Sequence, residues 1–572
     1  MTVVTAARPH RRLTWLNVAN IGFVFRPRIM AHLRSYSRDD FAKDSAAGLT
    51  VGIVALPLAL AFGIASGVRP DQGLVTAIIA GFLISALGGS RVQIGGPAGA
   101  FVALLYTVVE KYGVANLLIA TMMAGVFLFA MGAFKLGNLV RYIPVSIITG
   151  FTAGIAVIIG VSQIKDLLGL TMEKVPSNFF SQISAIADAI STVNWYAVAI
   201  GLSSLLLIVM WPVGYKENAS RFKRITAKLP STLIVLVVWS ILVAVFHLPV
   251  ETIGSKFGEL PSGLPIPAFP VFDWQTAQNL VAPSIAIALL CAIESLLCAR
   301  LADGMIQDRH DPNQELMAQG VANFVVPWFG GIAATGTIAR TVTNVRSGAR
   351  TPVAGIIHAL VLLVIVLAAA PAASHIPLAA LAAILLWVAY SMGEWRAFRE
   401  LAQYSMFYRA TLLATFLLTV VFDIVVAVEV GLVMSSLFFI YRISSLTKVE
   451  EIMLPADAAL RPDGKRIGAY ALFGSLFFGS VTKLEQLLDP QRKLPDVLIL
   501  EMHQVINLDT TGLDALESLH HLTVRQGGRL ILAGLNEQPL SLIRRSQFAD
   551  LLGADNIVPS LALALASAQQ SA

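Results

Sequence analysis

The chain has 572 residues, of which 56% are hydrophobic and only 13% are charged, and its mean hydropathy is +0.73. A soluble protein carries about twice that share of charged residues. These values exclude an ordinary cytosolic enzyme, a disordered chain and a nucleic-acid-binding protein, and two cysteines exclude a disulfide scaffold. The composition predicts that most of the chain lies in a membrane.

Residues 1–45 hold most of the excess positive charge. The net charge of the chain is +6, and this segment contains eight Lys or Arg residues against three Asp residues. Basic segments beside a spanning helix stay on the cytoplasmic side of the membrane. We therefore predict a cytoplasmic, partly interfacial N-terminal segment before the first span.

From residue 46 to about residue 445 the chain is a series of apolar runs, many of them close to the roughly 20 residues that a helix needs to cross a bilayer. Basic residues gather after spans six, ten and twelve, whereas the long segment 249–281 contains Lys256 as its one basic residue. This alternation fits fourteen spans with both termini in the cytoplasm. The predicted spans are 46–66, 73–89, 97–110, 116–134, 142–162, 194–213, 229–248, 282–302, 314–329, 335–345, 353–371, 376–392, 408–422 and 425–443.

The third and tenth spans both open with small residues. The sequence reads GGPAGAF at 95–101 and GGIAATGTIARTVTNV at 330–345, and each of these spans is too short to cross a membrane alone. They lie seven spans apart, and a repeat of seven spans inverts its second copy. Interrupted segments in matching positions of two halves predict a transporter binding site, with close helix packing as the alternative.

Two intramembrane charges are candidates for function. Glu294 lies in the middle of the eighth span, where we predict a proton-coupling group, with a structural ion pair as the alternative. Arg340 lies in the tenth span, where it can pair with Glu294 or help to hold an anion. Backbone N–H groups at the starts of spans three and ten favour an anion. The other predicted contacts are Ala98, Gly99, Ala100, Thr337, Ile338, Ala339 and, as an apolar wall, Phe62.

Motifs for metal binding and catalysis are missing from the sequence. It contains neither HExxH spacing nor a GxxxxGK[ST] motif, and no His/Cys cluster is present. We therefore expect no metal, no cofactor, no ATP-driven step and no enzyme activity.

Beyond residue 445 polar residues return, and short strands alternate with helices. This pattern indicates a small cytoplasmic α/β domain. The predicted strands are 468–478, 496–501 and 529–535, and the predicted helices are 482–488, 512–526 and 538–552.

One helix of this domain has a candidate regulatory start. Asp509 follows a predicted buried strand and is placed to cap the helix, whose first turn holds Thr510 and Thr511. A phosphoryl group at this position would be favoured by the helix dipole. A capped helix without a ligand is the alternative.

Several segments resemble the SulP family of sulfate permease-type anion transporters. They are GLTVGIVALPLALAFGIASGV, SRVQIGGPAGAF, YIPVSIITGFTAGI, AIESLLCARLADGM and FGGIAATGTIARTVTNVRSGART. The C-terminal domain, with its LDTTG sequence, resembles a STAS domain. The resemblance runs from about residue 39 to about residue 563.

The resemblance implies a polytopic α-helical membrane protein with about fourteen spans. These spans form two inverted seven-span repeats, divided into core and gate domains, and a small cytoplasmic α/β STAS domain follows. It also implies a homodimer, an elevator-like movement of the core and an anion site at Phe62, Pro97–Ala100 and Thr337–Arg340, with Glu294 as the acid of span eight. We place the domains at 1–45, 46–445 and 450–570.

The chain departs from its relatives at several of these positions. Ala339 stands where some relatives have Ser, and Glu294 stands where sodium-bicarbonate relatives have Asp. Ala55 and Leu58 replace glutamines of chloride-handling animal relatives, and Thr510 replaces the Ser of phosphorylated anti-sigma-factor antagonists. These differences weaken the case for sodium coupling and for a phosphorylated serine.

Within the family, the segments IESLLCA and YIPVSIITGFTAGI resemble most closely the bacterial C4-dicarboxylate transporters. This implies proton-coupled uptake of succinate, fumarate or aspartate across the bacterial inner membrane, with the anion, protons and membrane lipid as partners. Transport or exchange of sulfate or bicarbonate is the alternative within the family. The alternative of another class is a membrane-anchored signalling protein whose STAS domain binds a soluble partner.

Overall fold

The chain forms two compact units, which meet between Leu432 and Val433 in the sequence. The first 24 residues of the predicted basic segment, and the predicted basic loop at 212–229, lie outside the residues that the structure describes. The computed structural model describes residues 25–33, 36–138, 143–172, 176, 178–211, 230–259, 261, 263–270, 274–422, 424–456, 458–485, 487 and 493–570.

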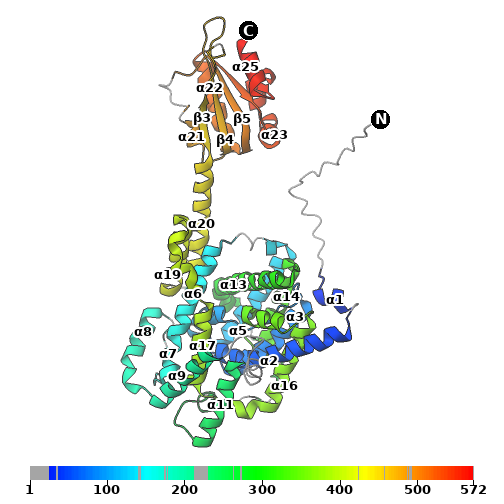
Figure 1. Cartoon of the computed structure of the whole chain (residues 1–572), viewed down its shortest axis with the longest axis vertical. Coiled ribbons are helices and arrows are strands. Elements are labelled where there is room, and N and C mark those ends of the chain that lie inside the picture. The colour runs from blue at the N-terminus through cyan, green and yellow to red at the C-terminus, as the bar shows by residue number, and fades with distance from the viewer. Residues whose placement is uncertain are drawn as a thin grey trace, which may run out of the picture. The chain divides into compact units, whose positions relative to one another are not determined.

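Each of the fourteen predicted spans coincides with a helix (Figure 1). Within the described residues, six helices are long and apolar enough to cross a membrane, and five are shorter apolar helices. The other three are α4, α14 and α15, with 11, 14 and 9 residues. The helices are α2 (Arg38–Ala65), α3 (Pro70–Leu87), α4 (Val102–Tyr112), α5 (Val114–Ala133), α6 (Val145–Ser162), α9 (Trp195–Met210), α11 (Ser231–Phe246), α13 (Trp274–Ile306), α14 (Pro312–Val325), α15 (Ile338–Arg346), α16 (Val353–Ala373), α17 (Leu378–Met392), α19 (Met406–Val421) and α20 (Ile424–Leu446).

Helix α2 begins earlier than predicted, at Arg38 instead of residue 46. The Ser37 hydroxyl caps its first turn by accepting a hydrogen bond of 3.1 Å from the Asp40 N–H. The buried Asp44 carboxylate accepts further bonds from the backbone N–H groups of Arg350 and Thr351, at 2.7 and 3.1 Å. Polar contacts therefore stabilise helical residues before the apolar run begins. A hydropathy pattern cannot predict this part of the helix.

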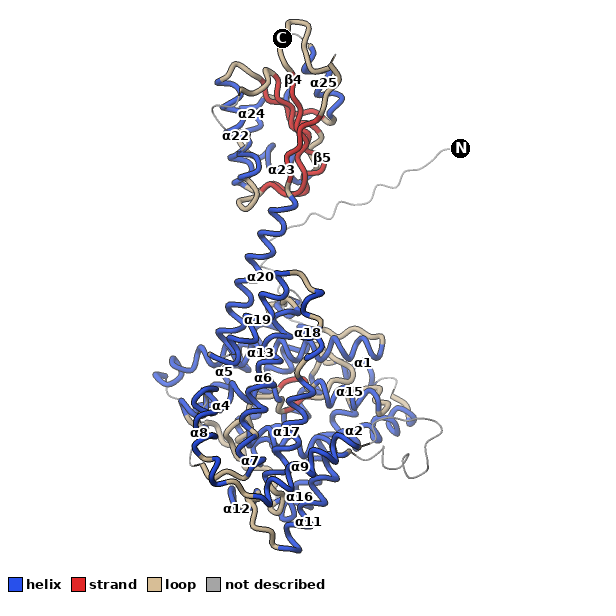
Figure 2. Tube along the Cα trace, turned by 60° about the vertical axis from the view of Figure 1, so that its left-hand side comes forward, coloured by secondary structure: helices blue, strands red, loops and turns tan. Residues whose placement is uncertain are grey.

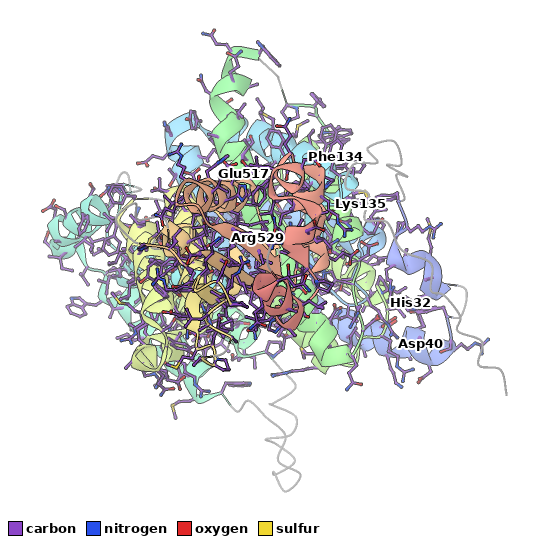
Figure 3. The ribbon with its side chains drawn as sticks, turned by 90° about the horizontal axis from the view of Figure 1, so that it is seen from above. His32, Asp40, Phe134, Lys135, Glu517 and Arg529 are labelled. Atoms are coloured by element: carbon purple, nitrogen blue, oxygen red, sulfur yellow. The ribbon has the colours of Figure 1, made fainter. Side chains whose placement is uncertain are left out.

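Short helices connect the long ones. In α1, the Arg28 guanidinium binds both carboxylate oxygens of Asp308, at 2.9 and 3.0 Å. His32 of the same helix lies within electrostatic range of Asp40 at the start of α2, and both residues are at one edge of this unit (Figure 3). The short helices are α1 (Arg28–Leu33), α7 (Ile164–Leu168), α8 (Phe179–Asp188), α12 (Ile253–Phe257) and α18 (Trp395–Arg399).

The helices divide into two packing groups. Helices α2, α3, α4, α5, α13, α14, α15 and α16 pack on one another, and they correspond to spans one to four and eight to eleven. Helices α6, α9, α11, α17 and α19 form the second group, which corresponds to the remaining spans without α20. This division is the core and gate arrangement that the sequence resemblance implied.

The packing repeats after seven spans. Helix α5 packs on α14 as α16 packs on α3, and α2 packs on α16 as α13 packs on α5. In the gate, α6 packs on α19 as α17 packs on α9. In each comparison a helix is replaced by the one seven spans away, as two inverted seven-span repeats require.

Glycines on both helices allow the close contact between α5 and α14. A Cβ atom on Gly125 would lie 2.7 Å from the carbonyl oxygen of Gly320, and a Cβ atom on Gly320 would lie 2.8 Å from the carbonyl oxygen of Gly125. Small residues let two helix backbones approach in a membrane, where dispersion and not water expulsion holds them together.

The C-terminal unit contains a five-stranded sheet in the order β3-β4-β5-β6-β7 (Figure 2). The pair β3–β4 is antiparallel and the other pairs are parallel. Alternate strand residues face α22, α23 and α24 on one side and α25 on the other. The elements are β3 (Lys448–Ile452), β4 (Ile467–Leu476), α21 (Thr482–Glu485), β5 (Val497–Leu508), α22 (Thr510–Arg525), β6 (Arg529–Ala533), α23 (Glu537–Arg545), α24 (Phe548–Leu552), β7 (Ile557–Val558) and α25 (Leu561–Gln569).

The three predicted strands of this domain are present, the predicted helix 538–552 is two helices, α23 and α24, and two edge strands and helix α25 were not predicted. Edge strand β3 reads KVEEI and β7 has two residues, so neither shows the apolar alternation of a central strand. Strand β5 continues seven residues past its predicted end, through exposed residues such as His503 and Ile506. This extension of β5 pairs with β4, and its exposed side chains give no alternating apolar pattern from which a strand could be predicted.

We expect acid to destabilise the C-terminal unit through His520 of α22. Burial, with His521 as a smaller cause, lowers the pKa of His520, and its ring packs against Phe548 at 6.0 Å. A folded-state pKa below the unfolded value of about 6.5 makes this contribution complete above pH 6.5 and removes it as the pH falls through the folded-state pKa. Hydrogen exchange of α22 in the full-length protein, corrected for intrinsic rates, should show less protection at pH 5.5 than at pH 7.5.

The control for this prediction is the neighbouring exposed histidine. His520→Gln should remove most of the pH dependence of protection, whereas His521→Gln, which removes only the smaller cause of the lowered pKa, should leave most of it. Equal pH dependence in all three proteins would rule out His520 as the responsible group.

Candidate functional site

Two very short strands cross inside the helical unit. Strand β1 (Gly95–Gly96) pairs antiparallel with β2 (Thr335–Gly336), with Gly95 opposite Gly336 and Gly96 opposite Thr335. Figure 2 shows them as the strand segment among the helices. The pairing brings together the starts of α4 and α15, which the sequence predicted as matching half-spans.

Thr337 and Thr341 fasten this crossing from the α15 side. The N–H and the hydroxyl of Thr337 both donate to the carbonyl oxygen of Ile94, at 2.8 and 3.0 Å. The Ile94 N–H in turn donates to the Thr341 hydroxyl at 3.0 Å. The Thr337 hydroxyl, which we expected near the anion, is therefore used by the backbone of the opposite segment.

A row of buried polar side chains on α14 forms hydrogen bonds with the segments that precede β1 and β2. Glu315 accepts hydrogen bonds from the N–H groups of Gly89 and Ser90, at 2.9 and 3.1 Å, and from the Gln319 amide at 2.9 Å. Asn323 lies one turn beyond Gln319 and binds the segment before β2. All three side chains are fully buried, so the row joins the loop before β1 to the loop before β2.

Asn323 holds Ala334 through two hydrogen bonds. Its amide nitrogen donates to the Ala334 carbonyl oxygen and its amide oxygen accepts from the Ala334 N–H, both at 2.8 Å. These bonds satisfy both backbone groups of a buried residue outside regular structure.

Two glutamines brace the crossing in the same way from opposite ends. Gln72 follows Pro70 at the start of α3 and donates to the Gly330 carbonyl oxygen at 2.7 Å. Gln314 follows Pro312 at the start of α14 and donates to the Leu87 carbonyl oxygen at 2.6 Å. The sequences PDQGL and PNQEL are thus one motif in two inverted copies, a signal that our sequence prediction missed.

Helix α4, with the 3-10 turn before it, and helix α15 both start without a side-chain cap. Ala98 precedes the single 3-10 turn Gly99–Phe101, and Thr337 precedes α15, and neither side chain caps its helix. Ile338 and Ala339 are exposed, Ile338 to 43%. Uncapped N–H groups and positive dipole ends at both starts favour an anion.

Phe62 of α2 forms an apolar wall at the start of α4. A Cβ atom on Gly99 would lie 3.2 Å from the Phe62 ring and 2.8 Å from the sulfur atom of Met392, at the end of α17. Gly99 therefore lets both side chains approach the backbone. Met392 is a gate residue at this position that the sequence did not identify.

Arg340 lies behind the crossing strands, with 1% of its surface exposed. Its Nη2 atom donates to the Pro97 carbonyl oxygen at 3.4 Å. Its Nη1 atom packs on Gly96, 2.4 Å from where a Cβ atom would lie, and has no hydrogen-bond partner among the described residues. The guanidinium thus places a positive charge beneath Pro97, next to the start of the 3-10 turn.

Glu294 of α13 does not form the expected ion pair with Arg340. Among the described residues, no ion pair or hydrogen bond joins the two side chains, because the guanidinium turns toward Gly96 and Pro97. Glu294 is 8% exposed, and its neighbours Cys291 and Ser295 accept bonds at their carbonyl oxygens from the opposite segments. The carboxylate therefore lies beside the strand crossing without a hydrogen-bond or ion-pair partner in the described part of the chain.

The start of α22 in the C-terminal unit is capped as predicted. The Asp509 carboxylate accepts from the Gly512 N–H at 2.8 Å and from the Phe478 N–H at 3.2 Å. Thr510 and Thr511 are exposed on the first turn.

Comparison with known proteins agrees with this arrangement. Residues 41–415 match the sulfate permease family, and residues 462–564 match the STAS domain. The chain belongs to the sulfate permease family. It is therefore an anion transporter of the membrane with a C-terminal STAS domain, and it is not an enzyme.

Relatives in this family come from different bacteria. The chain is 40% identical over 529 residues to the putative sulfate transporter YvdB of Bacillus subtilis, which covers 92% of this chain and 97% of the relative. It is 29% identical over 509 residues to the bicarbonate transporter BicA of a Picosynechococcus species, which covers 85% and 86% of the two chains.

Solved structures of family members share the fold. The transmembrane domain of a cyanobacterial BicA is 31% identical, with a TM-score of 0.61 over 70% of this chain and 98% of that one. The structure of SLC26A9 is 19% identical, with a TM-score of 0.83 over 95% and 92% of the two chains. The second likeness supports the fold alone.

Proposed function

We propose that this sulfate permease family member binds its anion between the starts of α4 and α15 and couples uptake to protons. The observation that supports this best is the β1–β2 crossing, which holds two uncapped helix starts above the buried charge of Arg340. Phe62 and Met392 supply an apolar wall beside the Gly99 backbone. The predicted contacts at Pro97–Ala100 and Thr337–Arg340 are part of this proposed site. The Thr337 side chain contributes by binding the Ile94 carbonyl oxygen and not the anion.

We propose C4-dicarboxylates, such as succinate, fumarate and aspartate, as the substrates. Support comes from the resemblance of the IESLLCA and YIPVSIITGFTAGI segments to the family's dicarboxylate transporters. Sulfate and bicarbonate are the second candidates, because two relatives carry those anions in their names. Competition among succinate, sulfate, bicarbonate and chloride for uptake into proteoliposomes, at two pH values, decides between them.

We propose Glu294 as the proton-coupling group. It is a carboxylate in the middle of a spanning helix, beside the strand crossing and without a protein partner among the described residues. A carboxylate in that position is free to change its protonation when the site opens to either side, whereas one locked in an ion pair stays charged.

Glu294→Gln should abolish the stimulation of uptake by an inwardly directed proton gradient. Glutamine keeps the shape and hydrogen-bonding capacity but cannot titrate, so exchange of substrate at equal pH should continue. The measurement compares gradient-driven uptake with equal-pH exchange in proteoliposomes.

Glu429→Gln is the matched control, since Glu429 is an exposed carboxylate on α20, away from the core helices. Its gradient-driven uptake should equal that of the unmodified protein. Gradient-driven uptake that survives in Glu294→Gln would assign the coupling to another group.

We further propose a bacterial inner-membrane location, cytoplasmic termini and a homodimer. The alternation of basic segments in the sequence supports the orientation, and the family resemblance supports the dimer. A regulatory role for Asp509, Thr510 and Thr511, through phosphorylation or a soluble partner, stays a prediction.

A further inference from the structure

An apolar cavity of about 340 Å³ lies between the core and the gate. Its walls come from α2, α3 and α16 of the core and from α11 of the gate, and the segment that follows α12 completes the lining. Helices α11 and α16 lie side by side in both views of the fold (Figures 1 and 2). None of the residues proposed for the anion site lines this cavity.

The cavity has a buried floor and an exposed apolar mouth. Ile78 of α3 and Leu236 of α11 line it with 5% and 3% of their surface exposed. Val237 and Ile241 of α11 also line it, with 48% and 56% exposed. On α16, the neighbouring Val364 is 62% exposed. Both helices are apolar spans, so their exposed apolar side chains face lipid, and the cavity opens toward the hydrocarbon of the bilayer.

The walls of the cavity favour an apolar occupant over water. Asp71 and Ser240 are the two polar side chains of the lining, and the Asp71 carboxylate is already paired with Arg69 at 2.9 Å. A buried water needs about two to four polar partners, and apolar cavities of roughly 150 Å³ stay dry and take up apolar guests such as benzene. A larger apolar cavity beside lipid therefore favours a hydrocarbon chain.

The depth of the cavity fits one acyl chain. Its α11 wall runs from Leu233 to Ile241, which is about 12 Å along a helix. One leaflet supplies about half of the roughly 30 Å hydrocarbon core of a bilayer. A chain from a single leaflet is therefore long enough to fill the cavity.

The polar end of the cavity suits a phospholipid headgroup. Asp71 begins the α3 wall, in the first turn of the helix, and accepts a hydrogen bond of 2.9 Å from Nε of Arg69. Nη1 of Arg69 donates to the Phe257 carbonyl oxygen at 2.8 Å. The arginine side chain is 46% exposed, so its outer side is accessible to a phosphate, an anion that guanidinium groups bind well.

We propose that this cavity binds one acyl chain of a membrane phospholipid. The chain contacts α3 and α16 of the core and α11 of the gate, so its binding stabilises the relative position of core and gate in this structure. Phospholipid is the abundant source of such chains on the side to which the cavity opens. This site is independent of the identity of the transported anion and of proton coupling.

Val366→Phe tests the site, because Val366 of α16 is 9% exposed and lines the cavity. Dioleoylphosphatidylethanolamine is titrated into the delipidated full-length protein in detergent, and bound lipid is counted by native mass spectrometry. The Kd for the first bound lipid should rise by about 10-fold or more, since excluding two CH₂ groups from an apolar site already has that effect.

Val364→Phe is the matched control, because it makes the same change two residues away on the same helix, at an exposed position outside the lining. Its Kd should equal that of the unmodified protein. An equal Kd in Val366→Phe would overturn the proposal, and so would tighter binding of oleic acid than of the phospholipid in the same titration.

A second measurement uses the unmodified protein in proteoliposomes. A phospholipid with a diazirine at the end of one acyl chain is cross-linked by light, and the labelled residues are identified by mass spectrometry. Ile78 and Leu236 should be labelled, because lipid outside the cavity does not reach such buried side chains. Labels confined to exposed residues such as Val245 and Val364 would overturn the proposal, whether or not Val366→Phe assembles.

Discussion

Replacing Arg340 with Met should lower anion uptake by about 100-fold, the upper effect of losing one hydrogen bond to a charged group, and should not lower the thermal stability of the protein. The arginine is 1% exposed, makes one protein hydrogen bond of 3.4 Å and leaves Nη1 without a protein partner in the described part of the chain. A buried charge with so little compensation destabilises a fold, and an apolar residue of similar length is often neutral or stabilising. Uptake into proteoliposomes and thermal unfolding of the purified protein test the two halves of this prediction.

Arg346→Met is the matched control, because Arg346 lies exposed at the last turn of the same helix. It should leave uptake within about 2-fold of the unmodified value, as expected for a surface substitution. A loss of stability in Arg340→Met without a loss of uptake would show that the arginine serves the fold and not the anion.

Replacing Asn323 with Leu should destabilise the protein by about 1 to 3 kcal/mol, since the buried Ala334 N–H group loses its partner, whereas the Ala334 carbonyl oxygen keeps the weak donor Cys291 Sγ at 3.3 Å. Both hydrogen bonds of the Asn323 side chain with Ala334 are 2.8 Å long, and the residue is fully buried. Without these bonds the segment before β2 is no longer hydrogen-bonded to α14 through Asn323. The start of α15, which follows β2, is then less firmly positioned at the proposed anion site. The expected result is a lower unfolding temperature together with lower uptake.

Asn116→Leu makes the same change at a half-buried position on α5. Asn116 donates one local bond, of 2.8 Å, to the Tyr112 carbonyl oxygen, so its loss should cost within about 0.5 kcal/mol. Equal unfolding temperatures for the two leucine variants would mean that the Asn323 bonds do not hold β2.

The number and order of the spans were predictable because an apolar run of sufficient length has few other stable locations than a bilayer. The half-spans were predictable for the same reason: GGPAGAF and GGIAATG interrupt apolar runs at matching positions. The PDQGL and PNQEL copies were available as a further signal of the inverted repeat. Glutamine has no distinctive role at the start of a helix, so the equivalence of the two copies is visible only in the matching bonds to Gly330 and Leu87.

The partners of the polar side chains were not predictable. The sequence allows Arg340 to pair with Glu294 or to help hold an anion, and in the structure its guanidinium donates to the Pro97 carbonyl oxygen. The Thr337 hydroxyl was expected near the anion, yet it donates to Ile94. In both observed bonds the partners are 243 residues apart in the sequence, and only the β1–β2 crossing brings them within reach.

The low share of charged residues and the apolar runs were enough to predict a membrane protein with fourteen spans, because the cost of placing polar groups in lipid acts on each segment separately. Which acceptor Arg340 binds and which segments Asn323 joins were decided by the tertiary structure. These features depend on short distances between helices whose relative positions come from packing, and a hydrogen bond forms or fails over a few tenths of an ångström.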